Sequence, residues 1–162
     1  MDLASWSLGI TLIVVTIAIH STAVVFMAFA LEARVRRAGQ RADLSHAVPT
    51  VIGRIAAVAL ALTVLHGLEG VLWAVAYRAL GAFDSFTQAS VYALATMTTF
   101  EISGVTLPSR FHMISALEGV NGVLLFGIST AFLFAVIQVH WQRLSHRRQP
   151  TADPGETESP SQ

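Results

Sequence analysis

Cysteine and lysine are both absent from this 162-residue chain, and charged residues make up only 12% of it. Without cysteine there is no disulfide, no thiolate metal ligand and no cysteine nucleophile, and the redox compartment stays undetermined. A soluble domain typically carries about twice this share of charged residues. The net charge is zero, so composition gives no reason to expect a nucleic-acid partner. Since 54% of the residues are hydrophobic, the composition predicts an integral membrane protein.

Sequence patterns typical of enzymes are missing as well. No nucleophile is paired with a base, and no glycine-rich loop suited to phosphate is present. We therefore expect no enzymatic activity. We also find no segment typical of a soluble sensor domain, and the first apolar segment lacks the arginine ladder of a voltage sensor.

Long apolar segments dominate the sequence. Leu8–Leu31, Val51–Leu80 and His112–Trp141 are each long enough to cross a bilayer. Ala28-Phe-Ala30 has the small residues of a signal-peptide cleavage site. However, the residues at the N-terminus include an acid and no base, and the apolar run is longer than that of a signal peptide. We therefore predict that the first segment is a membrane span.

The arginines predict an orientation. Eight of the ten lie in residues 32–50, at Arg54 or after residue 141, and the other two are Arg78 and Arg110. Because arginine gathers on the cytoplasmic side, we expect the C-terminus in the cytoplasm and the N-terminus outside. Residues 1–50 then form the first span and an arginine-rich loop, and residues 51–141 hold the other two spans. Residues 142–162, rich in Pro, Ser, Thr and Glu, form a tail that should be disordered.

A shorter helix is predicted between the second and third spans, from Asp84 to about Thr99. An apolar run of this length is too short to cross a bilayer and is more often re-entrant or buried. Its polar residues would be costly against lipid, so they must lie inside protein or line water. These residues are Ser85, Thr87, Gln88, Ser90, Thr96, Thr98 and Thr99.

Three motifs together indicate a family. Thr96-Met-Thr-Thr99 ends the short helix, Leu117-Glu-Gly-Val-Asn-Gly122 opens the third span, and His66-Gly-Leu-Glu69 lies in the second, followed by Trp73 and Tyr77. In combination they resemble the pore helix, inner helix and outer helix of the bacterial two-transmembrane potassium-channel superfamily, here with an extra N-terminal helix. The resemblance implies an all-α membrane fold with a re-entrant pore helix and a pore-domain-like module over residues 51–141. It also implies a homotetramer that conducts inorganic cations among the lipids of the bacterial inner membrane.

The loop after the threonines departs from that family. Its potassium channels continue with Gly-Tyr-Gly-Asp, whereas this chain has Glu101 and Ser103 at the glycine positions and Gly104 in place of the acid. A residue with a Cβ is strained at positive φ. We therefore expect no standard carbonyl ladder and no strict potassium selectivity. The residues expected to border the pore are Thr98, Thr99, Phe100, Glu101, Ile102, Ser103 and Gly104.

Glu101 has two interpretations. In the first, a ring of carboxylates from several subunits selects cations by charge. In the second, the loop is degenerate and Glu101 faces solvent or pairs with Arg110. Thr98 and Thr99 likewise either line the pore with hydroxyl groups or cap the end of the short helix.

Ionisable side chains occur near the middle of two spans. Glu69 follows His66 by three positions and shares its helical face. The first two spans run antiparallel, so His20 and His66 could meet. Such groups could form a proton site, a metal site or a pair of haem ligands. The alternative, which we favour, is a structural hydrogen bond between helices, with partners such as Ser90, Thr96 or Asn121.

The third span carries three glycines along one side and two polar residues in its outer half. Gly119, Gly122 and Gly127 are expected to allow a close helix crossing or a bend. Glu118 lies near the outer interface, where we expect it to anchor the filter loop. Asn121 lies one turn deeper and is expected to bond to the back of the pore helix.

We therefore expect one subunit of a tetrameric cation pore with a non-standard filter, Thr-Thr-Phe-Glu-Ile-Ser-Gly, and without a bound metal or cofactor. Two other classes stay open. One is a non-conducting pseudo-channel that keeps the fold as a structural or regulatory subunit. The other is a haem, redox or proton-conducting protein that uses His20, His66 and Glu69.

Overall fold

The computed structural model describes residues 3–38 and 47–146, and these residues form helices and turns with no strand among them. The elements in chain order are α1 (Leu3–Ala38), α2 (Ala47–Ala79), α3 (Phe86–Met97), the short 3-10 helix η2 (Ser109–Phe111) and α4 (His112–His146). Three helices are long and apolar enough to cross a membrane, over Ser5–Arg34, Pro49–Ala79 and Ser109–Trp141. The all-helical architecture with three such spans, predicted from the sequence, is confirmed.

The long helices extend beyond the apolar runs that predict them. α1 continues through the arginines to Ala38, and α2 begins before Pro49. Hydropathy marks the part that lipid would cover, whereas a helix continues in water where side chains support it. Arg36 donates to Glu32 one turn earlier, and proline is tolerated in a first turn. α4 likewise continues to His146, and the rest of the tail predicted to be disordered lies outside the described residues.

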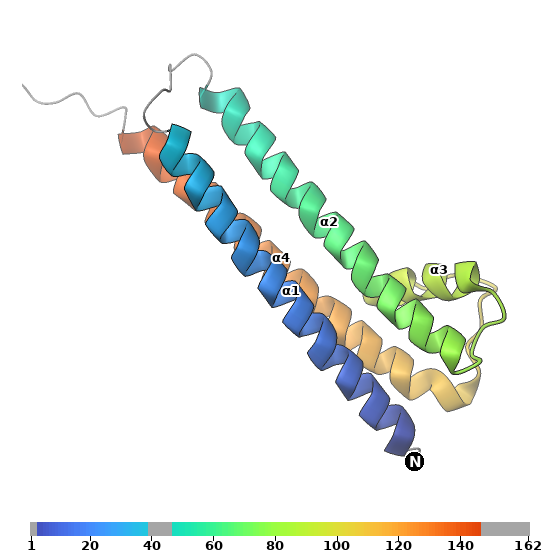
Figure 1. The fold of residues 1–162 in the computed structure, drawn as a ribbon. Helices are drawn as coiled ribbons and strands as arrows, with labels where there is room; N and C mark the ends of the chain where they lie inside the picture. Colours follow the sequence, from blue (N-terminus) through green and yellow to red (C-terminus); the bar gives the residue numbers. More distant parts are fainter. Residues whose placement is uncertain (1–2, 39–46, 147–162) are drawn as a thin grey trace, which may run out of the picture.

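The three long helices form one bundle (Figure 1). α1 and α4 run in the same direction, and α2 runs opposite to both. α1 packs mainly on α4, and α3 packs on both α2 and α4. α3 lies at the end of the bundle where α2 stops and α4 starts, which is also the end that holds the N-terminus of α1 (Figure 1). We call this the α3 end.

Two apolar clusters fill the interior. The larger lies toward the α3 end and contains Trp73, Tyr77, Phe83, Ile114 and Leu125, among others. The smaller lies toward the opposite end and is centred on Val58, Leu62 and Val136. Many outward-facing residues are also large and apolar, and Phe26 and Phe126 are both 68% exposed. Such a surface suits contact with lipid or with further copies of the chain.

Candidate functional site

α3 ends in a hydrogen-bonded turn that starts the filter-like loop. Thr98 is the C-cap, the Thr99 N–H donates to the Thr96 carbonyl at 3.0 Å, and the Phe100 N–H donates to the Ala95 carbonyl at 2.8 Å. These two bonds define a Schellman motif, which needs a left-handed residue and usually has glycine there. Thr99 takes that position with φ of 58°. Thr98 and Thr99 therefore cap the short helix, and both side chains are exposed.

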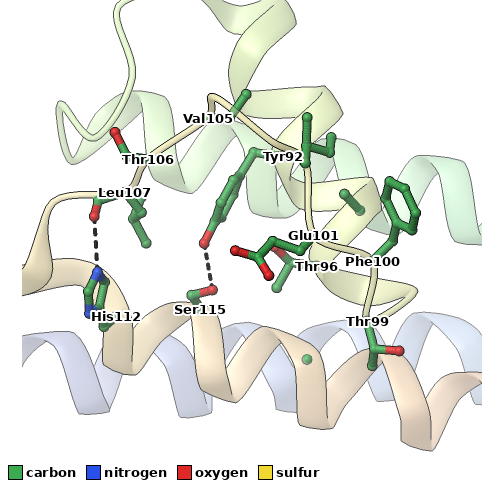
Figure 2. A pocket seen from close by; sticks show the side chains of 13 residues that line it. Tyr92, Thr96, Thr99, Phe100, Glu101, Val105, Thr106, Leu107, His112 and Ser115 are labelled. Carbon is green, nitrogen blue, oxygen red and sulfur yellow. Dashed lines mark hydrogen bonds between the residues drawn. The ribbon is translucent and has the colours of Figure 1, made fainter.

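The loop borders an open pocket of about 470 Å³ together with α3 and the first turns of α4 (Figure 2). The Glu101 side chain points into it, toward the hydrogen bond of 2.7 Å between the hydroxyls of Tyr92 and Ser115. At the other end of the pocket the His112 Nε2–H donates to the Leu107 carbonyl at 3.0 Å. The pocket therefore holds one carboxylate among hydroxyl and carbonyl oxygens, a lining that suits a cation better than an anion.

Of the two surroundings predicted for Glu101 in a degenerate loop, exposure to solvent is found and the ion pair with Arg110 is not. Glu101 is exposed, and the structure records no ion pair between it and Arg110, whose guanidinium lies 4.7 Å from the centre of the Phe111 ring. Among the described non-glycine residues only Thr99 has positive φ, so Glu101 and Ser103 lie outside the left-handed region. Gly104 has φ of 85° and Ile102 is half-buried. The backbone thus lacks the two left-handed positions that a potassium filter places at its glycines.

Four polar side chains from three helices meet inside the bundle. His20 Nδ1 lies 2.9 Å from Glu69 Oε1, and His20 Nε2 lies 3.0 Å from Ser129 Oγ. His66 Nε2 lies 3.1 Å from the same Ser129 oxygen. His66 Nδ1 lies 3.4 Å from Glu69 Oε2, at ion-pair distance but without hydrogen-bond geometry. We call these four residues the central cluster.

The central cluster sits near the middle of the apolar spans, and most of it is buried. His20 comes from α1, His66 and Glu69 from adjacent turns of α2, and Ser129 from α4. His20 and Glu69 are fully buried, and the His66 side chain is 26% exposed. The two imidazole rings are 5.1 Å apart. The meeting of His20 with His66, left open by the sequence, is therefore observed, although the structural partner is Ser129 and not Ser90, Thr96 or Asn121.

The central cluster contains residue types that can bind a metal ion. One ligand atom from each of His20, His66 and Glu69 lies within 4.8 Å of the others. With neutral imidazoles and one carboxylate, a divalent cation would leave a net charge of +1 in the membrane interior, which is costly. In addition, every ring nitrogen already faces a polar partner within the cluster. We therefore assign neither a metal nor haem to it.

Two further polar pairs lie between the central cluster and the pocket. The Tyr77 hydroxyl donates to Glu118 Oε2 at 2.6 Å, and the Thr16 hydroxyl lies 3.1 Å from Asn121 Oδ1. All four side chains are buried. Glu118 Oε1 and Asn121 Nδ2 have no hydrogen-bond partner among the described residues. Glu118 thus bonds to α2 and not to the filter loop, and Asn121 bonds to α1 and not to the pore helix.

The three glycines of α4 do not share one role. A Cβ on Gly122 would overlap the backbone of Met97, the last residue of α3, and one on Gly119 would lie 3.8 Å from the Thr96 carbonyl oxygen. Gly127 has no neighbouring atom within 4 Å of such a Cβ. Gly119 and Gly122 therefore seat the end of α3, while Gly127 faces outward.

Sequence reasoning missed Ser129, Thr16, Ser115 and Tyr92 as members of the polar interior. Hydroxyl residues are common in membrane helices and often bond within their own helix, so they give little signal. Thr16 also bonds to Leu12, as that rule expects. Helical spacing could have identified Ser129, because it follows Glu118 by eleven positions, or about three turns, and so lies on the same face of the helix.

No protein-family model matches the chain, and neither a curated protein nor a solved structure is significantly similar to it. The resemblance to the potassium-channel superfamily therefore stays a prediction from motifs.

Proposed function

We propose that several copies of this chain assemble into a cation-permeable membrane pore with Glu101 at its mouth. The observation that carries the proposal is the placement of one exposed carboxylate in the pocket that α3 and the filter-like loop form at the end of the spans. A carboxylate ring is one of the known ways to select cations.

The end of α3 adds to the negative potential at this place. A helix C-terminus carries roughly half a negative charge because its last carbonyls lack partners along the helix. α3 ends at Met97, four residues before Glu101. The nearest arginine in sequence, Arg110, stacks over Phe111 and has no recorded ion pair with Glu101. Dipole and carboxylate thus both favour a cation.

A single copy cannot enclose a pore, so the proposal requires assembly. Part of α4 faces away from the other helices, and Gly127, Thr130 and Ala131 are exposed there. Small residues of this kind allow close packing between membrane helices. Large apolar residues flank them, including Val123 and Phe126, which are 57% and 68% exposed. We propose that this face of α4 meets identical copies, and the family resemblance favours four.

The loop favours weak discrimination among cations. Potassium selectivity relies on rings of backbone carbonyls, whereas Glu101 and Ser103 do not have the positive φ that such a filter requires at its glycine positions. Selection by charge would admit sodium and potassium alike. The same feature favours the second candidate function, a subunit that keeps the helical architecture and does not conduct.

Ion flux into proteoliposomes tests the proposal. Wild-type protein should carry sodium and potassium, and Glu101→Gln should lower cation flux by roughly tenfold, since a focused negative potential raises local cation concentration by at least that factor. Asp84→Asn is the matched control, because Asp84 is another exposed carboxylate at the α3 end. It should leave the flux unchanged.

The state of assembly must be measured on the same samples. Wild-type protein that forms stable oligomers and yet carries no cation would overturn the pore proposal in favour of the non-conducting subunit. Equal loss in Glu101→Gln and Asp84→Asn would show that general surface charge, and not the position of Glu101, drives the flux.

A further inference from the structure

We propose that the central cluster of His20, Glu69, His66 and Ser129 is a binding site for one exchangeable proton, reached from the α3 end of the bundle. This inference is independent of the proposed pore, because it concerns the interior of a single copy.

Proton counting gives the first argument. The cluster has four contacts between nitrogen or oxygen atoms, and each can be a hydrogen bond only if it holds one proton. Two neutral imidazoles and one hydroxyl supply three protons, and an ionised carboxylate supplies none. One of the four contacts must therefore lack a proton unless the cluster takes up one more. With a fourth proton, each of the four contacts has the proton that a hydrogen bond requires.

The distances identify which contact is open. Three contacts measure 2.9, 3.0 and 3.1 Å, whereas His66 Nδ1 and Glu69 Oε2 are 3.4 Å apart without hydrogen-bond geometry. In the three-proton state His20 donates to Glu69 and accepts from Ser129, and His66 donates to Ser129. The remaining His66 nitrogen and the Glu69 oxygen then face each other with lone pairs. The extra proton binds between these two atoms.

Electrical neutrality gives the second argument. With three protons the cluster carries one negative charge, and with four it carries none. A net charge near the middle of a bilayer costs several kcal/mol, and no arginine or other histidine of the described residues is recorded in contact with the cluster. A proton supplies the single positive charge that the site lacks, which neither a divalent metal nor a neutral ligand does.

The surroundings of the cluster differ between its two sides. Toward the α3 end, Thr16 lies one turn of α1 from His20 and contacts Asn121 of α4. Glu118 lies about one turn of α4 from Asn121, closer to the α3 end. Glu118 bonds to Tyr77, whose ring packs against that of Tyr92 in the wall of the Glu101 pocket. Polar side chains thus reach from the pocket to the cluster.

Toward the end of the bundle that carries Arg34, Arg36 and Arg37, the buried side chains next to the cluster are apolar. They are Leu65, Leu62, Val58 and Val136. His140 lies beyond them, and its ring nitrogen is bonded to the Val136 carbonyl at 2.8 Å. Among the described residues, a proton therefore has polar side chains along its way on the α3 side and only apolar ones next to the cluster on the other. The site senses the pH at the α3 end and does not pass protons across the membrane.

The bound proton also ties helices together. His20 is the only histidine of α1, and its bonds to Glu69 and Ser129 join α1 to α2 and α4 at mid-depth. Removal of the proton leaves a buried negative charge between the helices and leaves His66 Nδ1 and Glu69 Oε2 without a hydrogen bond. Acidity at the α3 end thus strengthens the packing of the three spans.

Nuclear magnetic resonance of isotope-labelled histidine in lipid nanodiscs tests the binding site. The His20 and His66 ring signals should change together in one step that corresponds to one proton for the pair. Ser129→Ala removes no ionisable group but breaks the hydrogen-bonded link between the two imidazole rings and leaves only the Glu69 carboxylate between them, so the common step should split into two. Thr130→Ala, which removes an exposed hydroxyl bonded within α4, is the matched control and should keep the single step.

Two independent one-proton steps in the wild type, or no step for either ring between about pH 4 and 9, would overturn the site. The route is tested separately in proteoliposomes with the pH changed on one side at a time. The histidine signals should follow the pH at the α3 end alone. Signals that follow the arginine-rich side, or pyranine-reported proton flux through the wild type that Glu69→Gln abolishes, would overturn one-sided access.

Discussion

Gly122 of α4 lies directly against the backbone of Met97, where α3 ends. A Cβ at Gly122 would overlap the carbonyl oxygen and the Cα of Met97. A backbone cannot move aside as the tip of a flexible side chain can, so this contact fixes the position of the α3 end relative to α4. The filter-like loop starts one residue later, and its place in the molecule depends on this glycine.

Gly122→Ala should therefore displace α3 and destabilise the protein. Overpacking of a filled site costs about 1–3 kcal/mol, and contact with backbone puts this case at the upper end. Gly53→Ala in α2 is the control, since nothing lies within 4 Å of its added Cβ and Gly53 is outside the face of α4 proposed to meet other copies. It should be neutral or stabilising by up to about 1 kcal/mol through helix propensity. Unfolding in mixed micelles measures both, and equal stability of the two variants would contradict the close contact.

Replacement of Thr99 by glycine should increase the stability of the protein, whereas Gly122→Ala should decrease it. A β-branched residue at φ of 58° is strained, and glycine is the usual residue at this place in a Schellman motif. Thr99→Gly should stabilise the protein by about 1 kcal/mol. Thr98→Gly should instead destabilise it, because Thr98 has an ordinary φ of −92° and its hydroxyl donates to the carbonyls of Leu94 and Ala95. Equal effects of the two changes on the unfolding free energy would refute the backbone argument.

The sequence was sufficient for the elements that hydropathy and turn chemistry determine. Three spans, the short helix after Asp84 and the shared face of His66 and Glu69 follow from run length and helical period alone. Helix ends did not follow, because α1 continues past its apolar run, where Arg36 donates to Glu32, and α4 continues to His146. An apolar run measures lipid contact and not helix length.

Contacts between helices were less accessible to sequence reasoning. His20, His66 and Glu69 stood out because ionisable groups are rare inside spans. Ser129 joins them only because α1, α2 and α4 pack with one particular rotation, and no local pattern encodes that rotation. Glu118 illustrates the same limit, since its bond to Tyr77 on another helix was not predicted.

The bond between Tyr77 and Glu118 should stabilise the packing of α2 on α4. Tyr77→Phe removes the donor to Glu118 Oε2, and the other carboxylate oxygen has no partner among the described residues. The buried carboxyl group is then unsatisfied, which should cost about 1–3 kcal/mol. Tyr92→Phe removes a half-buried bond to Ser115 and should cost less, about 0.5–1.5 kcal/mol.

A double substitution separates the bond from the burial of each side chain. Tyr77→Phe with Glu118→Leu replaces both partners by apolar groups, and its stability should recover most of the loss of the single Tyr77→Phe variant. Unfolding free energies of the four proteins in this cycle supply the test. A double variant that is less stable than Tyr77→Phe alone would show that Glu118 has a second stabilising contact.

The direction of the chain across the membrane gives the last prediction, and the absence of cysteine makes it simple to test. Ser103 lies in the filter-like loop at the α3 end, and Ala33 lies among the arginines near the other end of α1; both are exposed. Because arginines gather on the cytoplasmic side, a membrane-impermeant maleimide added to intact cells should label Ser103→Cys and not Ala33→Cys. Permeabilised cells should show both labelled. Labelling of Ala33→Cys alone in intact cells would invert the orientation and place the Glu101 pocket in the cytoplasm, so that the proton site would sense cytoplasmic pH.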